Sequence, residues 1–94
     1  MSGALASTEA PSLIEFPSAF PIKVLGLNEA GFVEAMVAIA RGFDPAFDAE
    51  AVTLRPSRSD RYLGVTLTVT ATSREQLDGL YRALSGHALV KVVL

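Results

Sequence analysis

The sequence contains no cysteine, no tryptophan and one histidine, His87, among its 94 residues. Without cysteine the chain has no disulfide, no thiolate ligand for zinc or an iron–sulfur cluster, and no thiol nucleophile. It also shows no pairing of a nucleophile with a base and no cofactor motif. We therefore expect no catalytic residue and no cofactor, and a non-catalytic protein is the favoured class.

Metal ligands are also scarce. His87 needs three carboxylates beside it to complete a zinc site. Asp44, Asp48 and Glu50 share one stretch of sequence, but their spacing is not that of a calcium-binding EF-hand and the required glycine is missing. We expect no metal site, and we expect Asp44, which precedes Pro45, to shape a turn.

The sequence also lacks a long apolar run and an excess of positive charge. No stretch approaches the ~18 consecutive apolar residues of a membrane-spanning helix, and residues 1–12 lack the basic and apolar regions of a signal peptide. We therefore expect a soluble, cytoplasmic protein with no membrane contact. The net charge of −2 argues against non-specific binding of nucleic acid.

The composition that is present is typical of a small folded domain. Half of the residues are hydrophobic and 19% are charged, which is the balance of a globular chain of one domain. Residues 1–12 are small and polar and are predicted to form a disordered tail. Residues 13–94 are then the single domain.

The first half of this domain predicts a strand followed by a helix. Two Phe-Pro pairs precede a strand over residues 22–25, and we expect Phe16 and Phe20 to be held extended and to anchor in the core. Asn28 is the predicted N-cap of the helix that follows. Gly42 is the predicted end of that helix, in the left-handed conformation.

The second half predicts a hairpin, a helix and a last strand. Strands over residues 51–57 and 62–72 flank a short turn, and in the second of them leucine and valine alternate with threonine. Ser73 and Gln76 form a capping box for the second helix, which Gly86 ends. Because crossovers are right-handed, the order β-α-β-β-α-β predicts a ferredoxin-like α+β sandwich, with a four-stranded antiparallel sheet and two helices on one face.

One face of this sheet is left without helices, and we expect it to bind a protein partner or a second copy of the chain. Exposed aliphatic side chains beside threonines are typical of such contacts. On this interpretation Leu89→Asp dissociates a homodimer. Alternation along the strands assigns these residues to the open face: Lys23, Leu25, Thr53, Arg55, Thr66, Thr68, Thr70, Leu89, Lys91 and Val93.

Three segments carry a resemblance to a known family. The stretches "EFPSAFPIKVLG", "RPSRSDRYLGVTLTVTATSREQLDGLYRAL" and "VKVVL" resemble the YbeD-like family of small bacterial proteins of unknown function. The resemblance implies a ferredoxin-like fold similar to the ACT regulatory domain of phosphoglycerate dehydrogenase. A regulatory role in amino-acid or lipoate metabolism has been suggested for the family, and no catalytic residue carries over from it.

The first alternative function is a sensor of the ACT type. In such modules an amino acid binds at the turn between the first strand and the first helix. Here this turn contains Gly26, Asn28 and Gly31. The glycines allow close approach, and Asn28 with the free helix amides is suited to a carboxylate or another small anion.

The second alternative is a weak nucleic-acid binder. Arg55, Arg58 and Arg61 surround the turn of the hairpin, where guanidinium groups are suited to bidentate contact with an anion; Lys23 and Lys91 would add to them. RNA-recognition modules of this fold carry aromatic residues on their central strands. This sequence has threonines there, over residues 66–70, which argues against nucleic acid.

Overall fold

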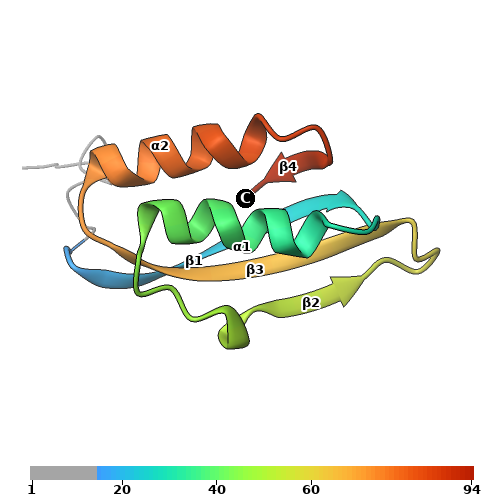
Figure 1. Cartoon of the computed structure of the whole chain (residues 1–94), viewed down its shortest axis with the longest axis horizontal. Helices are drawn as coiled ribbons and strands as arrows, with labels where there is room; N and C mark the ends of the chain where they lie inside the picture. Colours follow the sequence, from blue (N-terminus) through green and yellow to red (C-terminus); the bar gives the residue numbers. More distant parts are fainter. Residues whose placement is uncertain (1–14) are drawn as a thin grey trace, which may run out of the picture.

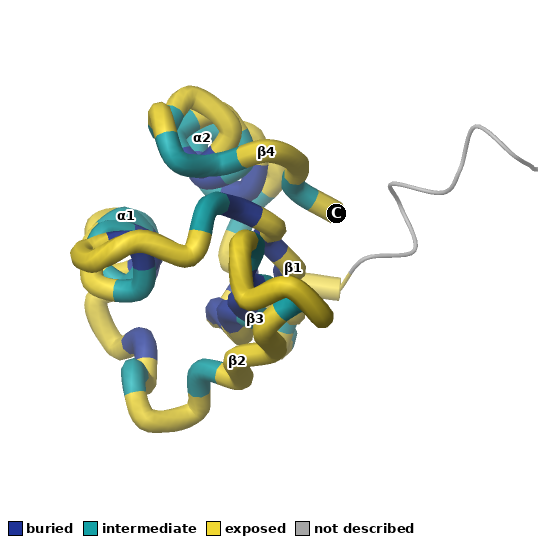
Figure 2. Tube along the Cα trace, turned by 90° about the vertical axis from the view of Figure 1, so that its right-hand side faces the viewer, coloured by how far each residue is buried: buried dark blue, intermediate teal, exposed yellow. Residues whose placement is uncertain are grey.

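A computed structural model describes residues 15–94 and confirms the βαββαβ order (Figure 1). The sheet has the strand order β2-β3-β1-β4, and each neighbouring pair is antiparallel. Both helices lie on the same side of this sheet (Figure 2), so the two-layer ferredoxin-like arrangement is confirmed. The predicted tail, residues 1–12, lies outside the described residues. The elements are β1 (Ser18–Leu27), α1 (Phe32–Phe43), the short 3-10 helix η2 (Ala49–Ala51), β2 (Thr53–Pro56), β3 (Tyr62–Ala71), α2 (Arg74–Ser85) and β4 (Val90–Val93).

The core lies between the sheet and the two helices. Every second residue of the central strands β1 and β3 points toward the helices, because side chains alternate along a strand. The helices contribute residues three or four positions apart, which form one face of a helix. The central buried side chains are Ile22, Val24, Phe32, Met36, Ala40, Leu63, Val65, Leu67, Val69, Leu77, Leu80 and Leu84.

The two ends of α1 differ from the prediction. Gly31, with a φ of 89°, is the N-cap, so Asn28 is not. A turn precedes the helix, in which the amide of Phe32 donates to the carbonyl of Glu29 at 3.1 Å. Gly42 does not end the helix, which continues to Phe43. The ring of Phe43 lies so close to α2 that a Cβ on Gly79 would be 2.8 Å from it, and this contact favours the helical position of Phe43.

The start of α2 agrees with the prediction. The side chain of Ser73 accepts a hydrogen bond from the amide of Gln76 at 3.0 Å. The side chain of Gln76 accepts from the amide of Thr72 at 2.7 Å, one residue before the position of a standard capping box. At the other end Gly86 ends the helix, as predicted, in a right-handed conformation with a φ of −82°.

The prediction for the two Phe-Pro pairs is half right. Phe20 packs against the core, but Phe16 is 39% exposed because the paired part of β1 begins only at Ser18. The amide of Lys23 donates to the carbonyl of Leu94, on the β4 side of the strand. The nitrogen of Pro21, two residues earlier, faces the same edge, so its missing N–H removes no bond to β3.

Two side chains take the place of a strand at the free edge of β3. Strand β2 pairs with β3 only as far as Thr66. Beyond it, the amide of Thr70 donates to Oδ2 of Asp44 at 2.9 Å, and the carbonyl of Thr70 accepts from Nε2 of Gln76 at 3.0 Å. The other oxygen of Asp44 accepts from the amide of Ala46, which makes the expected turn. The buried carboxylate of Asp44 thereby joins the end of α1 to the sheet.

Candidate functional site

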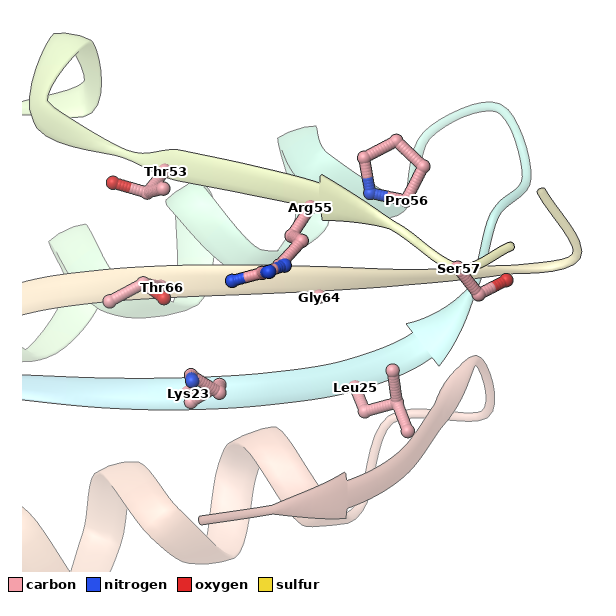
Figure 3. A pocket seen from close by; sticks show the side chains of 8 residues that line it. All are labelled: Lys23, Leu25, Thr53, Arg55, Pro56, Ser57, Gly64 and Thr66. Atoms are coloured by element: carbon pink, nitrogen blue, oxygen red, sulfur yellow. The ribbon is translucent and has the colours of Figure 1, made fainter. Parts of the chain in front are cut away.

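The uncovered face of the sheet has a regular arrangement of side chains over three of its four strands, β2, β3 and β1. Thr66 lies opposite Thr53 on one side and Lys23 on the other. In the next row on the same face, Gly64 lies opposite Arg55 and Leu25. Figure 3 shows these residues on the open side of the ribbon, in two adjacent rows.

A hollow of about 420 Å³ lies over these two rows. Its size is within the range of ligand pockets, which begins at about 300 Å³. Gly64 leaves space at the middle of the hollow because it has no side chain, and the Arg55 side chain extends from β2 over β3 (Figure 3). The residues that line it are Lys23, Leu25, Thr53, Arg55, Pro56, Ser57, Gly64 and Thr66.

The charge of the strands differs in sign from that of the whole chain. The four strands contain three cationic residues, Lys23, Arg55 and Lys91, and no aspartate or glutamate. The net charge of the chain is nevertheless −2, so the acidic residues lie in helices and loops or before β1. Neither Lys23 nor Arg55 makes a side-chain hydrogen bond to another residue of the range 15–94. Their charged groups are therefore available to a ligand.

The structure corrects the assignment of two β4 residues to the open face. Val93 lies opposite the core residue Val24, and both Val93 and Leu89 pack against the core. The residue on the open face is Val92, which is 42% exposed and lies opposite Leu25. The register of β4 shifts at a bulge beside Leu25, and such a shift reverses the faces that simple alternation predicts.

Two other predicted members of the open face lie on it but outside the hollow. Thr68 and Thr70 continue the row of threonines along β3 and are exposed, beyond the end of β2. Lys91 is exposed at the bulge of β4, between Val90 and Val92. The hollow thus occupies only the half of the face that β2 borders.

The turn between β1 and α1 has structural roles for the residues predicted to bind an effector. A Cβ on Gly26 would lie 2.6 Å from the carbonyl oxygen of Leu89 and would overlap the ring of Phe32. Nδ2 of Asn28 donates to the carbonyl of Asp60 at 3.0 Å. Gly31 supplies the positive φ at the start of α1. The polar group expected to receive a carboxylate is thus already bonded to the β2–β3 turn.

The three arginines of the hairpin do not form one cluster. Arg55 lines the hollow on the open face, whereas Arg58 and Arg61 are exposed in the turn beyond β2 and do not line it. That turn is held by the Ser57 hydroxyl, which accepts from the amide of Tyr62 at 3.1 Å. Of the three arginines, Arg55 is therefore the one that lies in the candidate site.

The remaining polar candidates have local partners. Nδ1 of His87 accepts from the amide of Leu89 at 3.1 Å, in the turn before β4. The carboxylate of Asp48 accepts from the amide of Glu50 at 2.9 Å and caps η2. Within residues 15–94, no three side chains of histidine, aspartate or glutamate are grouped as a metal ion requires. None of the helices in this range is long and apolar enough to cross a membrane.

Tyr81 lies in an environment that changes its acidity. Its side chain lies partly buried between α2 and the C-terminal end, and its hydroxyl donates to the carbonyl of Leu94 at 3.4 Å. Burial raises the pKa of Tyr81 above the ordinary value of 10.0. Its phenol therefore keeps its proton at neutral pH. Tyr81 does not line the hollow.

Sequence reasoning missed four residues of this surface. Pro56, Ser57 and Gly64 line the hollow, and Val92 extends its apolar side. The signal that was present is Gly64, because a glycine inside an alternating strand often marks a place where another group approaches closely. No pattern in the sequence indicated the bulge that turns Val92 outward.

Comparison with known proteins finds uncharacterised relatives. A family model described as "Protein of unknown function (DUF493)" matches residues 11–94. A UPF0250 protein of Leptothrix cholodnii is 65% identical over 83 residues, which are 88% of this chain and 91% of that protein. A UPF0250 protein of Bordetella parapertussis is 55% identical with the same coverage. One from Ralstonia nicotianae is 55% identical over 88% of this chain and 86% of its own length.

Proposed function

The chain belongs to the DUF493 family of proteins of unknown function, and we propose that it is a non-catalytic regulatory module that binds another protein through the open face of its sheet. The observation that carries this proposal is the hollow on that face, with free cationic groups and exposed aliphatic side chains around it. Apolar patches with polar surroundings are typical of protein contacts. The YbeD-like relationship, the similarity to the ACT domain and a cytoplasmic location are parts of the same proposal.

A different protein is a better partner for this face than a second copy of the chain. In a symmetric dimer the same patch occurs on both subunits. Two copies packed face to face would bring Lys23 and Arg55 of each near the same cations of the other, with no carboxylate on the strands to compensate. Like charges in contact disfavour association. A homodimer through this face is therefore the less favoured form of the proposal.

The alternatives draw less support from the geometry. An effector at the β1–α1 turn would compete with the existing bond of Asn28 to the Asp60 carbonyl. A nucleic-acid surface would need the hairpin arginines to act together, but Arg58 and Arg61 lie apart from the hollow that Arg55 lines. We keep both as outcomes that the experiments can reveal.

The proposal is tested by cross-linking from defined positions in living cells of the source bacterium. A photoreactive amino acid replaces Thr66 on the open face, and in a matched variant it replaces Arg82 on α2, which is exposed on the helical side. We expect a cross-linked protein from position 66 and not from position 82. Leu25→Asp, at the border of the hollow, should abolish the product.

Two results would count against the proposal. Cross-links from position 82 alone would place the contact on the helices, and no cross-linked protein from either position would leave the open face without a partner. Light scattering of the purified protein gives the independent test of a second copy. A dimer that Leu25→Asp dissociates would identify the partner as this same chain.

A further inference from the structure

We infer that the hollow receives an acidic segment of the partner protein, with an aliphatic side chain between two carboxylates. This inference rests on the proposed use of the open face and specifies the chemistry of what binds there. It depends on the charge of the strands, on the distance between two cations and on the space above Gly64. None of these involves the β1–α1 turn.

The charge of the face selects an anionic partner. All charged residues of the four strands are cations, although the chain as a whole is acidic. Lys23 and Arg55 lie on the strands β1 and β2 that border the hollow, and neither side chain makes a hydrogen bond to a carboxylate of residues 15–94. An arginine fork binds a carboxylate through two parallel hydrogen bonds. The hydroxyls of Thr53 and Thr66 lie on the same face as further donors.

The backbone positions of the two cationic residues match the spacing of residues four apart on an extended segment. Lys23 and Arg55 lie on β1 and β2, on either side of β3, and in successive rows of the same face. Strands lie ≈4.8 Å apart and rows are two residues apart, so the two Cα atoms are separated by roughly 12 Å. In an extended segment, residues four positions apart point to the same side and are separated by about 13 Å.

The middle of the hollow matches the residue between the two carboxylates. In an extended segment this residue, two positions from each acid, points the same way as they do. It would lie above Gly64, which has no side chain of its own, beside the Arg55 side chain that extends over β3 (Figure 3), and against the exposed aliphatic side chain of Leu25. The matching sequence is therefore Glu-x-Leu-x-Glu in an extended conformation, where x is any residue that faces away from the sheet.

The test uses three capped synthetic peptides, Glu-Ser-Leu-Ser-Glu, its glutamine version Gln-Ser-Leu-Ser-Gln, and Glu-Ser-Ala-Ser-Glu. Each is titrated into the isotope-labelled full chain, and the changes in amide NMR shifts give the location and the affinity. We expect the first peptide to shift amides around Thr66 and Gly64. An exposed ion pair contributes about 0.5 kcal/mol, so the glutamine peptide, which loses two such pairs, should bind about fivefold more weakly. The alanine peptide should also bind more weakly than the leucine peptide.

Matched variants of the protein locate the effect. The double variant Lys23→Gln/Arg55→Gln removes the same two ion pairs and should weaken binding of the first peptide by about fivefold. The control double variant Arg41→Gln/Arg82→Gln has the same net charge, but its changes are on the helices. It should bind within about twofold of the unaltered chain. Gly64→Ala should weaken binding by filling the hollow, with an unchanged circular dichroism spectrum as the check on folding.

Several outcomes would overturn the inference. These are no shifts on the open face at the highest peptide concentration, equal binding of the glutamine peptide, or an equal loss in the control variant. An oligonucleotide that displaces the peptide and binds more tightly would identify the face as a nucleic-acid surface. If the cross-link from Thr66 persists in Lys23→Gln/Arg55→Gln but is lost in Leu25→Asp, the proposed function stands and the acidic partner is wrong.

Discussion

Removal of the Asp44 carboxylate should destabilise the whole fold, although Asp44 lies in a connecting loop. The side chain is 7% exposed, and its two oxygens accept hydrogen bonds from the amides of Thr70 and Ala46 at 2.9 and 3.2 Å. A hydrogen bond to a charged group contributes about 1.5–3 kcal/mol. Asp44→Ala leaves both amides without a partner, so we expect the free energy of unfolding to fall by roughly 3–5 kcal/mol.

Asp48 offers a matched control in the same loop. Its carboxylate accepts a single bond, from the amide of Glu50, and it is exposed. Asp48→Ala should therefore lower the free energy of unfolding by only about 0.5–1 kcal/mol. Asp44→Asn, which keeps one acceptor oxygen, should fall between the two variants.

Urea unfolding at neutral pH measures these differences. With a dependence of about 1–3 kcal/mol per molar urea, Asp44→Ala should lower the unfolding midpoint by at least about 1 M. Hydrogen exchange should show a selective loss of protection at the amide of Thr70. If Asp44→Ala and Asp48→Ala differ by less than ~1 kcal/mol, the carboxylate of Asp44 does not hold the edge of β3 and the reasoning is refuted.

Three further contrasts test the packing. In Gly26→Ala the new Cβ would lie 2.6 Å from a backbone carbonyl oxygen, so the free energy of unfolding measured in urea should fall by about 1–3 kcal/mol. In Gly64→Ala the nearest carbonyl oxygen would be 3.4 Å away, so the change should be less than ~1 kcal/mol. Equal effects would contradict the close packing at position 26. Leu89→Asp places a charge against the core and should lower the free energy of unfolding by at least about 2 kcal/mol. Val92→Asp changes an exposed residue of the open face and should lower it by less than ~1 kcal/mol. The reverse order would show that the register of β4 is wrong. Because the pKa of Tyr81 is raised in the folded chain, the unfolded chain loses its phenol proton at lower pH. The free energy of unfolding, measured in urea at alkaline pH, should therefore fall as the pH rises above 10.0. An identical decline in Tyr81→Phe would exclude this cause.

The parts of the fold that depend on local periodicity were predictable. Leu63 and Val65 alternate with polar or small residues, which fixed β3 as a strand with one buried face. Ser73 marked the start of α2 correctly because its cap bond is made within the same turn. Lys23 and Arg55 were placed on the open face by the same alternation, so a large part of the candidate site followed from the sequence.

The failures of prediction depend on contacts between distant segments. Asn28 is a good N-cap by type, but its side chain bonds to the carbonyl of Asp60, 32 residues away. The bulge opposite Leu25 exchanged the faces of Val92 and Val93, and a one-residue shift in register has no signal in the alternation itself. The hollow required the register of β2 on β3, which brings Arg55 beside Gly64.

The edges of the sheet add a reason to place the partner on the open face. A sheet can bind another chain along an unpaired edge, but the edges described here are protected. The edge strands β2 and β4 have only four residues each, and short edge strands are a known protection against pairing with other chains. Beyond them, Pro21 has no amide hydrogen to offer at the free edge of β1, and Asp44 and Gln76 occupy the backbone groups of β3. Because the helices cover the other face, the uncovered face with its hollow is the broad surface through which this sheet meets a partner in our proposal.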